Sequence, residues 1–132
     1  MSTTATASAS GERTKAGIRL CTRQDLVPNS GVVAWHEGSQ IAVFAIPAGA
    51  STDLELYAVD NHDPFSGANV IGRGIVGELG GELVVASPIY KQHFRLRDGQ
   101  CVEDESRRLR CWPLAFDGDD VVLLQEDSIV RA

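Results

Sequence analysis

The sequence predicts an all-β domain, built as a sandwich or small barrel of short antiparallel strands. Three observations support this fold class. Short apolar segments rich in Val, Ile and Leu recur along the chain. Asp-Gly and glycine-rich turn sequences separate these segments. No segment has the periodicity of an amphipathic helix, and Glu103–Cys111, which could form one helical turn, lacks an apolar face.

The first half of the chain predicts four strands. Ile18–Arg23 is a short first strand. Val32–Ile46 contains two apolar segments on either side of the turn Glu37–Ser39, which is a hairpin signal. Leu54–Asp60 alternates apolar residues with polar or small ones, as a half-buried strand does.

In the second half, Asn61–Gly81 carries six glycines and one proline, so regular structure is expected to be sparse there. Trp112-Pro113 indicates an edge or bulged strand, because proline cannot donate to a sheet. The remaining strands are expected at Glu82–Pro88, His93–Leu96, Cys111–Phe116 and Asp120–Gln125, the last two flanking the turn Asp117–Asp119.

The length of 132 residues suits one domain. Residues 1–16 contain no large apolar side chain except Met1, so we expect a disordered N-terminal tail followed by a folded domain at residues 17–132. The tail lacks the apolar stretch of a secretory signal, which predicts a cytoplasmic protein. No apolar run approaches the ~18 residues of a membrane span, so no membrane partner is expected.

The formal net charge of −6 argues against a nucleic-acid partner, because such binding depends on clustered positive charge. Half of the 12 basic residues nevertheless fall between Lys91 and Arg110, interleaved with acidic residues. This pattern fits a solvated surface of mixed sign or the rim of a protein-binding surface. The three cysteines have no metal-binding or disulfide spacing, and we expect buried free thiols at Cys21, Cys101 and Cys111.

Two loops, Asn61–Asn69 and Ser87–His93, each follow a strand and could form a single tip. This arrangement resembles the Rieske domain, in which two such loops carry Cys-x-His and Cys-x-x-His as ligands of a [2Fe–2S] cluster. The resemblance therefore implies a Rieske-like fold with a two-loop tip. The residues at the four ligand positions of this sequence are Asn61, Asp63, Ser87 and Tyr90. None is a thiolate or an imidazole, so we expect no cofactor and no metal on this chain.

Two stretches carry a narrower resemblance, DNHDPFSGANVIGRGIVG from Asp60 and ASPIYKQHFRLRDGQCVED from Ala86. They resemble the small subunit of assimilatory NAD(P)H-dependent nitrite reductase, and the similarity runs from about Ile18 to Leu124. That family implies an accessory subunit without catalytic residues of its own. It docks on a large subunit that holds FAD, a [4Fe–4S] cluster and siroheme, and that reduces nitrite to ammonia in nitrate assimilation.

Aromatic and basic side chains at the tip are candidates for docking, because interfaces are enriched in aromatic residues and arginine. The candidates are Phe65, Tyr90, Lys91, Arg95 and Arg97. Phe65 and Tyr90 could instead pack with Phe94 as a small core in place of the cluster. A stand-alone Rieske-like protein-binding module that serves another oxidoreductase is the alternative function.

Two other sites are weaker hypotheses. His62, Asp63 and His93 offer ligands for a single metal ion, but loop capping and surface exposure explain these residues better. The glycines of Gly72–Gly77 have the spacing of a dinucleotide-binding loop, yet no helix is expected after them, as such a site requires.

Overall fold

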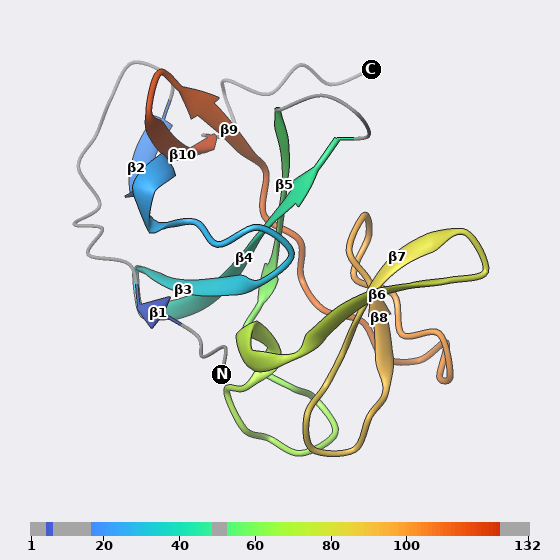
Figure 1. The fold of residues 1–132 in the computed structure, drawn as a ribbon. Helices are drawn as coiled ribbons and strands as arrows, with labels where there is room; N and C mark the ends of the chain where they lie inside the picture. The colour runs from blue at the N-terminus through green and yellow to red at the C-terminus, as the bar shows by residue number, and fades with distance from the viewer. Residues whose placement is uncertain (1–4, 7–16, 49–52, 125–132) are drawn as a thin grey trace, which may run out of the picture.

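The computed structural model describes residues 5–6, 17–48 and 53–124, and it confirms the all-β prediction. The described residues contain strands and two 3₁₀ turns, and no α-helix is present among them (Figure 1). The elements are β1 (Ala5–Thr6), β2 (Gly17–Thr22), η1 (Arg23–Asp25), β3 (Gly31–His36), β4 (Ser39–Pro47), β5 (Leu54–Asp60), η2 (Ile71–Arg73), β6 (Ile75–Leu79), β7 (Glu82–Ala86), β8 (His93–Arg95), β9 (Leu114–Asp117) and β10 (Asp120–Leu124).

The strands form three small sheets with the orders β1-β3-β4-β5, β2-β10-β9 and β6-β7-β8. All pairings are antiparallel except that of β1 with β3. In Figure 1, β2, β9 and β10 lie above β3 and β4, while β6 to β8 lie on the opposite side of the molecule. The long β4 therefore runs between the two outer sheets.

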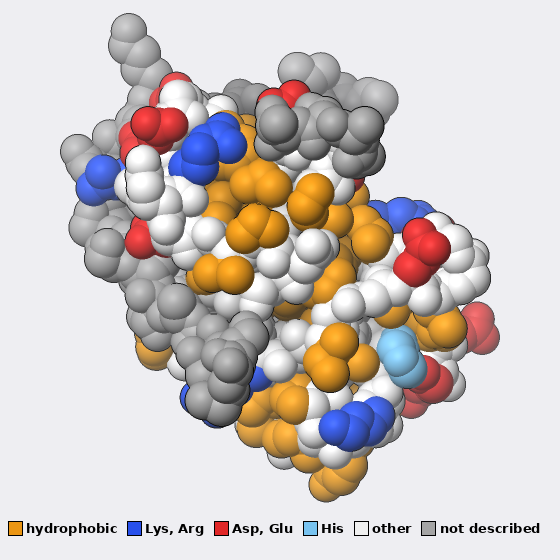
Figure 2. All heavy atoms as spheres, viewed as in Figure 1, with side chains coloured by type: hydrophobic (Ala, Val, Ile, Leu, Met, Phe, Trp, Pro, Cys, Tyr) orange, Lys and Arg blue, Asp and Glu red, His pale blue; other side chains and the backbone are white. Residues whose placement is uncertain are grey.

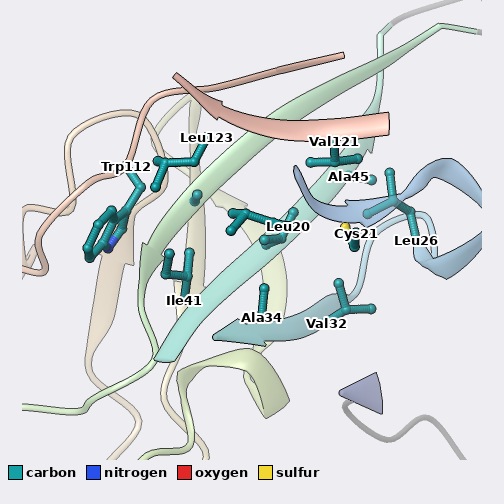
Figure 3. Close-up of a cluster of buried hydrophobic side chains, with 12 residues drawn as sticks. Leu20, Cys21, Leu26, Val32, Ala34, Ile41, Ala45, Trp112, Val121 and Leu123 are labelled. Atoms are coloured by element: carbon teal, nitrogen blue, oxygen red, sulfur yellow. The ribbon is translucent and has the colours of Figure 1, made fainter. Parts of the chain in front are cut away.

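Strand β4 is buried on both faces, because its alternate side chains enter two different cores. Ile41, Val43 and Ala45 face the first core, which β2 and β10 cover. Figure 3 shows this core, with Leu20 in its middle, Ile41 and Trp112 towards one end, and Val121 and Ala45 towards the other. The other face of β4 enters the second core, which includes Ala42, Phe44, Ile46, Val59, Ile71, Val85, Phe94, Leu96, Cys101 and Leu109.

Two hairpin predictions are confirmed. Glu37 and Gly38 have positive φ angles and connect β3 to β4, as the turn sequence indicated. The Asp-Gly turn at Gly118 connects β9 to β10 in the same manner. Trp112-Pro113 precedes β9, which lies at the edge of its sheet. This position agrees with the edge strand expected from the proline.

The expectation of sparse structure across Asn61–Gly81 is wrong for its last part. Strand β6 forms there and pairs with β7 through a turn at Gly80-Gly81, where both residues have positive φ. The flanking glycines obscured this strand, although the two-glycine turn is itself a hairpin signal. Cys111 is exposed, whereas Cys21 and Cys101 are buried as expected.

The boundary between tail and domain is described only in part. Ala5–Thr6, within the segment expected to be disordered, pairs in parallel with Val32 and Val33 of β3. Residues 1–4, 7–16, 49–52 and 125–132 lie outside the described part of the chain. Among the described residues, no helix has the length and apolar character needed to cross a membrane.

Candidate functional site

The two loops of the predicted tip lie side by side in the structure. Residues 61–69 follow β5, residues 87–92 connect β7 to β8, and both loops meet at the lower end of the molecule in Figure 1. A direct hydrogen bond joins them, because the Ser87 hydroxyl donates to Oδ2 of Asp63 over 2.5 Å. Both side chains are fully buried. We call these two loops the tip.

Ser87 organises its own loop through backbone as well as side-chain contacts. Its N–H donates to the carbonyl of Gln92 at 2.9 Å, and its carbonyl accepts from the N–H of Lys91 at 3.1 Å. The N–H of Ile89 lies 3.4 Å from the Ser87 hydroxyl oxygen. These hydrogen bonds close the loop around the buried Ser87, and Ile89, Tyr90 and Lys91 between its ends are exposed.

Asp63 has the same role in the other loop. Its Oδ1 accepts from the N–H of Phe65 at 2.8 Å, and its carbonyl accepts from the N–H of Gly67 at 2.8 Å. Burial acts to raise the pKa of Asp63, but hydrogen bonds from Ser87, Phe65 and Ser66 outweigh it, and the pKa is lowered from its ordinary value. Asp63 is thus an ionised carboxylate whose charge is met by hydrogen-bond donors.

Asn61 connects the tip to the body of the domain. Its Nδ2 donates to Oε1 of Gln40 at 2.9 Å and to the carbonyl of Asn69 at 3.2 Å. Its Oδ1 accepts from the N–H of Gly72 in η2 at 2.6 Å. The side chain is almost fully buried and uses both polar atoms. Asn61, Asp63 and Ser87, which we call the polar network, therefore fill three of the four predicted ligand positions.

Tyr90, at the fourth position, is separate from the polar network. Its side chain is 59% exposed, and the adjacent Ile89 is 43% exposed. Lys91 adopts a φ of +66°, a conformation that favours glycine, and its ammonium group donates to the carbonyl of Pro88 at 3.1 Å. A non-glycine residue with a positive φ is uncommon, and its backbone cost is one that glycine would relieve.

Phe65 occupies an intermediate position. Its ring centroid lies 6.1 Å from that of Phe94, which is fully buried in the second core. The guanidinium of Arg107 covers the ring at 5.5 Å and reaches the carbonyl of Pro64 at 3.4 Å. Phe65 therefore extends the core into the tip. Sequence reasoning noted Arg107 only as part of a basic cluster, because its contact spans 43 residues.

Arg95 and Arg97 do not lie with Tyr90 and Lys91. Arg95 forms two hydrogen bonds with the carboxylate of Asp98, at 3.0 and 2.6 Å. Arg97 pairs at 2.9 Å with Glu82, the residue that begins β7, whereas the tip loop follows the end of that strand. The structure thus separates the five predicted docking residues into two groups.

The donor atoms of the polar network do not suit a [2Fe–2S] cluster. Such a cluster takes thiolates and, in Rieske domains, imidazoles. The network instead offers an amide, a carboxylate and a hydroxyl, all buried and engaged in hydrogen bonds. The residues present therefore do not match the group, and no electron-transfer step follows from them.

The three residues considered for a single metal ion have different partners. The ring of His62 is 3.1 Å from Oδ1 of Asn69, Asp63 is bonded to Ser87, and Nδ1 of His93 is 2.6 Å from Oε2 of Glu103. No cluster of three or more potential ligands occurs in the part of the chain that the structure describes. Likewise, Gly72 lies in η2 and Gly77 in β6, without a following helix among those residues.

Replacing Ser87 with alanine leaves one oxygen of a buried carboxylate without its hydrogen-bond donor. We expect Ser87→Ala to lower the free energy of unfolding by about 1–3 kcal/mol, measured by chemical denaturation. Ser106→Ala is the matched control, because that hydroxyl bonds an exposed aspartate, and its change is expected to stay within about 0.5 kcal/mol. Equal losses for the two variants would contradict the role assigned to Ser87.

The lowered pKa of Asp63 predicts a dependence of stability on pH. Since the folded pKa lies below the unfolded one, the carboxylate contributes stability above the unfolded pKa and loses it as the pH falls through the folded pKa. In Asp63→Asn, this contribution is removed. The difference in unfolding free energy between wild type and variant should therefore be constant near neutral pH and shrink below about pH 4. A difference that grows on acidification would contradict the assignment.

Comparisons with known proteins identify the family. The Rieske-like [2Fe-2S] domain family matches residues 18–125. The nitrite reductase (NADH) small subunit of Salmonella typhimurium is 45% identical over 86 residues, which cover 65% of this chain and 76% of that protein. A segment of the nitrite reductase [NAD(P)H] large subunit of Klebsiella oxytoca is 34% identical over 113 residues, covering 86% of this chain and 11% of that one.

A solved structure agrees with these matches. The nitrite reductase [NAD(P)H] small subunit from Erwinia carotovora superposes with a TM-score of 0.68 at 39% identity, covering 90% of this chain and 88% of that one. Both the sequence and the fold thus match small subunits over most of their length. The chain belongs to the Rieske-like family of NAD(P)H-dependent nitrite reductase small subunits.

Proposed function

We propose that this chain is the accessory, non-redox subunit of a nitrite reductase, and that it docks on a large subunit carrying FAD, a [4Fe–4S] cluster and siroheme. The observation that carries the proposal is the polar network. At three of the four positions that the resemblance gives to cluster ligands, Ser87 donates to Asp63, and Asn61 bonds to Gln40 and to the N–H of Gly72. The polar network therefore maintains the conformation of the tip and has no role in electron transfer.

The Klebsiella oxytoca match supports a large subunit as the partner. In that protein, a segment similar to this chain is part of a chain named nitrite reductase large subunit. Domains that are joined covalently in one protein and separate in another commonly share an interface. The redox chemistry then belongs to the cofactors of the large subunit, and the small subunit acts by binding.

Tyr90 and Lys91 are the residues we assign to direct contact with the large subunit. Both lie in the loop that is closed on Ser87, so little conformational entropy is lost when the partner binds. Phe65 supports this loop from the side of the core. Arg95 and Arg97 are held by Asp98 and Glu82 away from the tip, so contact there requires a partner surface that also reaches the far end of β7.

The proposal predicts that the purified chain takes up no iron–sulfur cluster. Anaerobic reconstitution with iron and sulfide should leave iron far below stoichiometry and produce no [2Fe–2S] absorption. A cluster-binding Rieske ferredoxin treated in parallel verifies the procedure. Stoichiometric iron with the corresponding spectrum would overturn the non-redox assignment.

Tyr90→Ala should weaken binding to the purified large subunit by roughly 2 kcal/mol, because truncating an exposed aromatic contact removes much of its interface area. Its melting temperature should hardly change, since the side chain is 59% exposed. Lys91→Gly should also weaken binding, but it should keep or raise stability, because glycine relieves the positive φ.

Val27→Ala is the control for Tyr90→Ala, because Val27 is an exposed apolar residue, at 46%, between η1 and β3 and outside the tip. Titration calorimetry should give Val27→Ala the affinity of wild type. If Tyr90→Ala instead melts much earlier and, where folded, binds normally, Tyr90 is a structural residue and the docking role fails.

A further inference from the structure

The sheet β6-β7-β8 carries one row of side chains that continues beyond its last strand. Ile75 of β6 is opposite Ala86 of β7, and Ala86 is opposite His93 of β8. The N–H of Val102 donates to the carbonyl of His93 at 2.8 Å, and Cys101 forms a bridge with Phe94, so the segment around Val102 continues the sheet beside β8. Directly opposite residues present their side chains on the same face. Ile75, Ala86, His93 and Val102 therefore form one row, which we call the exposed row.

The adjacent row of side chains lies on the opposite face of the sheet, which agrees with the placement of the exposed row. Val76, Val85, Phe94 and Cys101 are opposite one another in the same register, and all four pack in or against the second core. Because side chains alternate along each strand, the exposed row must face away from that core.

The exposed row is unusually apolar for a surface. Ile75 is 76% exposed and Val102 is 47% exposed, and the loop that joins Ala86 to His93 adds Ile89 and Tyr90. These four are a majority of the seven large hydrophobic side chains that are exposed in the described part of the chain. Figure 2 shows hydrophobic side chains over this sheet with a histidine beside them. A gathering of exposed apolar side chains of this kind marks an interaction site.

His93 provides the polar group within the exposed row. Oε1 of Glu103 accepts from its backbone N–H at 2.8 Å, and Oε2 lies 2.6 Å from Nδ1. Burial acts to raise the pKa of Glu103, but the hydrogen bonds from His93 outweigh it and the pKa is lowered. Glu103 is thus an ionised acceptor that fixes the ring of His93 through Nδ1, and Nε2 can form a hydrogen bond with a partner.

We infer that the exposed row is the central part of the surface that binds the nitrite reductase large subunit, and that the Tyr90 loop is one edge of this surface. The inference rests on the proposed function and extends it from the tip to a face of the sheet. The row is continuous with the Tyr90–Lys91 loop through Ala86 and His93. The complementary surface is apolar, with a hydrogen-bonding group opposite His93 and a carboxylate near Lys91.

A large subunit is favoured over a second copy of this chain as the occupant. A segment similar to this chain is part of a chain named nitrite reductase large subunit in Klebsiella oxytoca, so there it is covalently joined to the rest of that chain.

The test is a double variant, Ile75→Thr with Val102→Thr, which keeps the β-branched shape but replaces apolar atoms with hydroxyls. Calorimetric titration against the cofactor-loaded large subunit should show affinity reduced by at least about tenfold, because the buried apolar area is lost. The matched control is Val27→Thr, since this β-branched side chain is 46% exposed and lies between η1 and β3, outside the sheet β6-β7-β8. The control should bind within about twofold of wild type.

The outcomes separate this inference from the proposed function. If wild type binds and the double variant binds equally well, the exposed row is not the interface, and the proposed function stands. If wild type does not bind the large subunit, the proposed function itself fails. If sedimentation shows that the wild type self-associates and that the double variant is monomeric, the exposed row binds a second copy of this chain. The inference is then overturned. Melting curves for every variant establish that each one is folded.

Discussion

The burial of β4 on both faces is the constraint on which the other elements depend. Six consecutive residues of this strand are buried, so each alternate side chain must find apolar partners on its own side. The sheet β2-β10-β9 supplies them on one side, and η2 with β7 and β8 supplies them on the other. A domain of this size gains two small cores from a single strand, and each core fixes the position of one outer sheet.

The tip inherits its position from this arrangement. Its loops leave the ends of β5 and β7, and both strands contribute side chains to the second core. Phe94 and Phe65 extend that core to the base of the tip, and the polar network then joins the two loops to each other and to Gln40 in β4. A charged hydrogen bond contributes about 1.5–3 kcal/mol, and a neutral one about half of that. A few such bonds are enough to order two short loops that already rest on a packed core.

Much of the fold could be predicted from the sequence, because alternation and turn chemistry are local signals. The strand at Leu54–Asp60 and the turns at Gly38 and Gly118 illustrate this. Strand β6 was missed because its glycine-rich surroundings conceal a five-residue, mostly exposed strand that pairs with β7. Pattern alone cannot recognise a strand that depends on a neighbour for its apolar contacts.

The site was predictable in its location but not in its internal contacts. Resemblance selected Asn61, Asp63 and Ser87, yet nothing in their spacing reveals that Ser87 donates to Asp63 across 24 residues. Tyr90 resembled the other three as a substituted ligand position, but it is exposed and separate from them. The exposed row could not be predicted from the sequence for the same reason. Ile75 and Val102 belong to one row only through the register of four paired segments.

The hydrogen bond between Ser87 and Asp63 also bears on how the complex is made in the cell. Loops that grip an iron–sulfur cluster reach their final form only after the cluster is inserted, because ligand ordering and metal binding are one process. Here the groups that join the loops are part of the polypeptide as it leaves the ribosome. Under the proposed function, the docking loops of the small subunit therefore reach their folded form without a supply of iron.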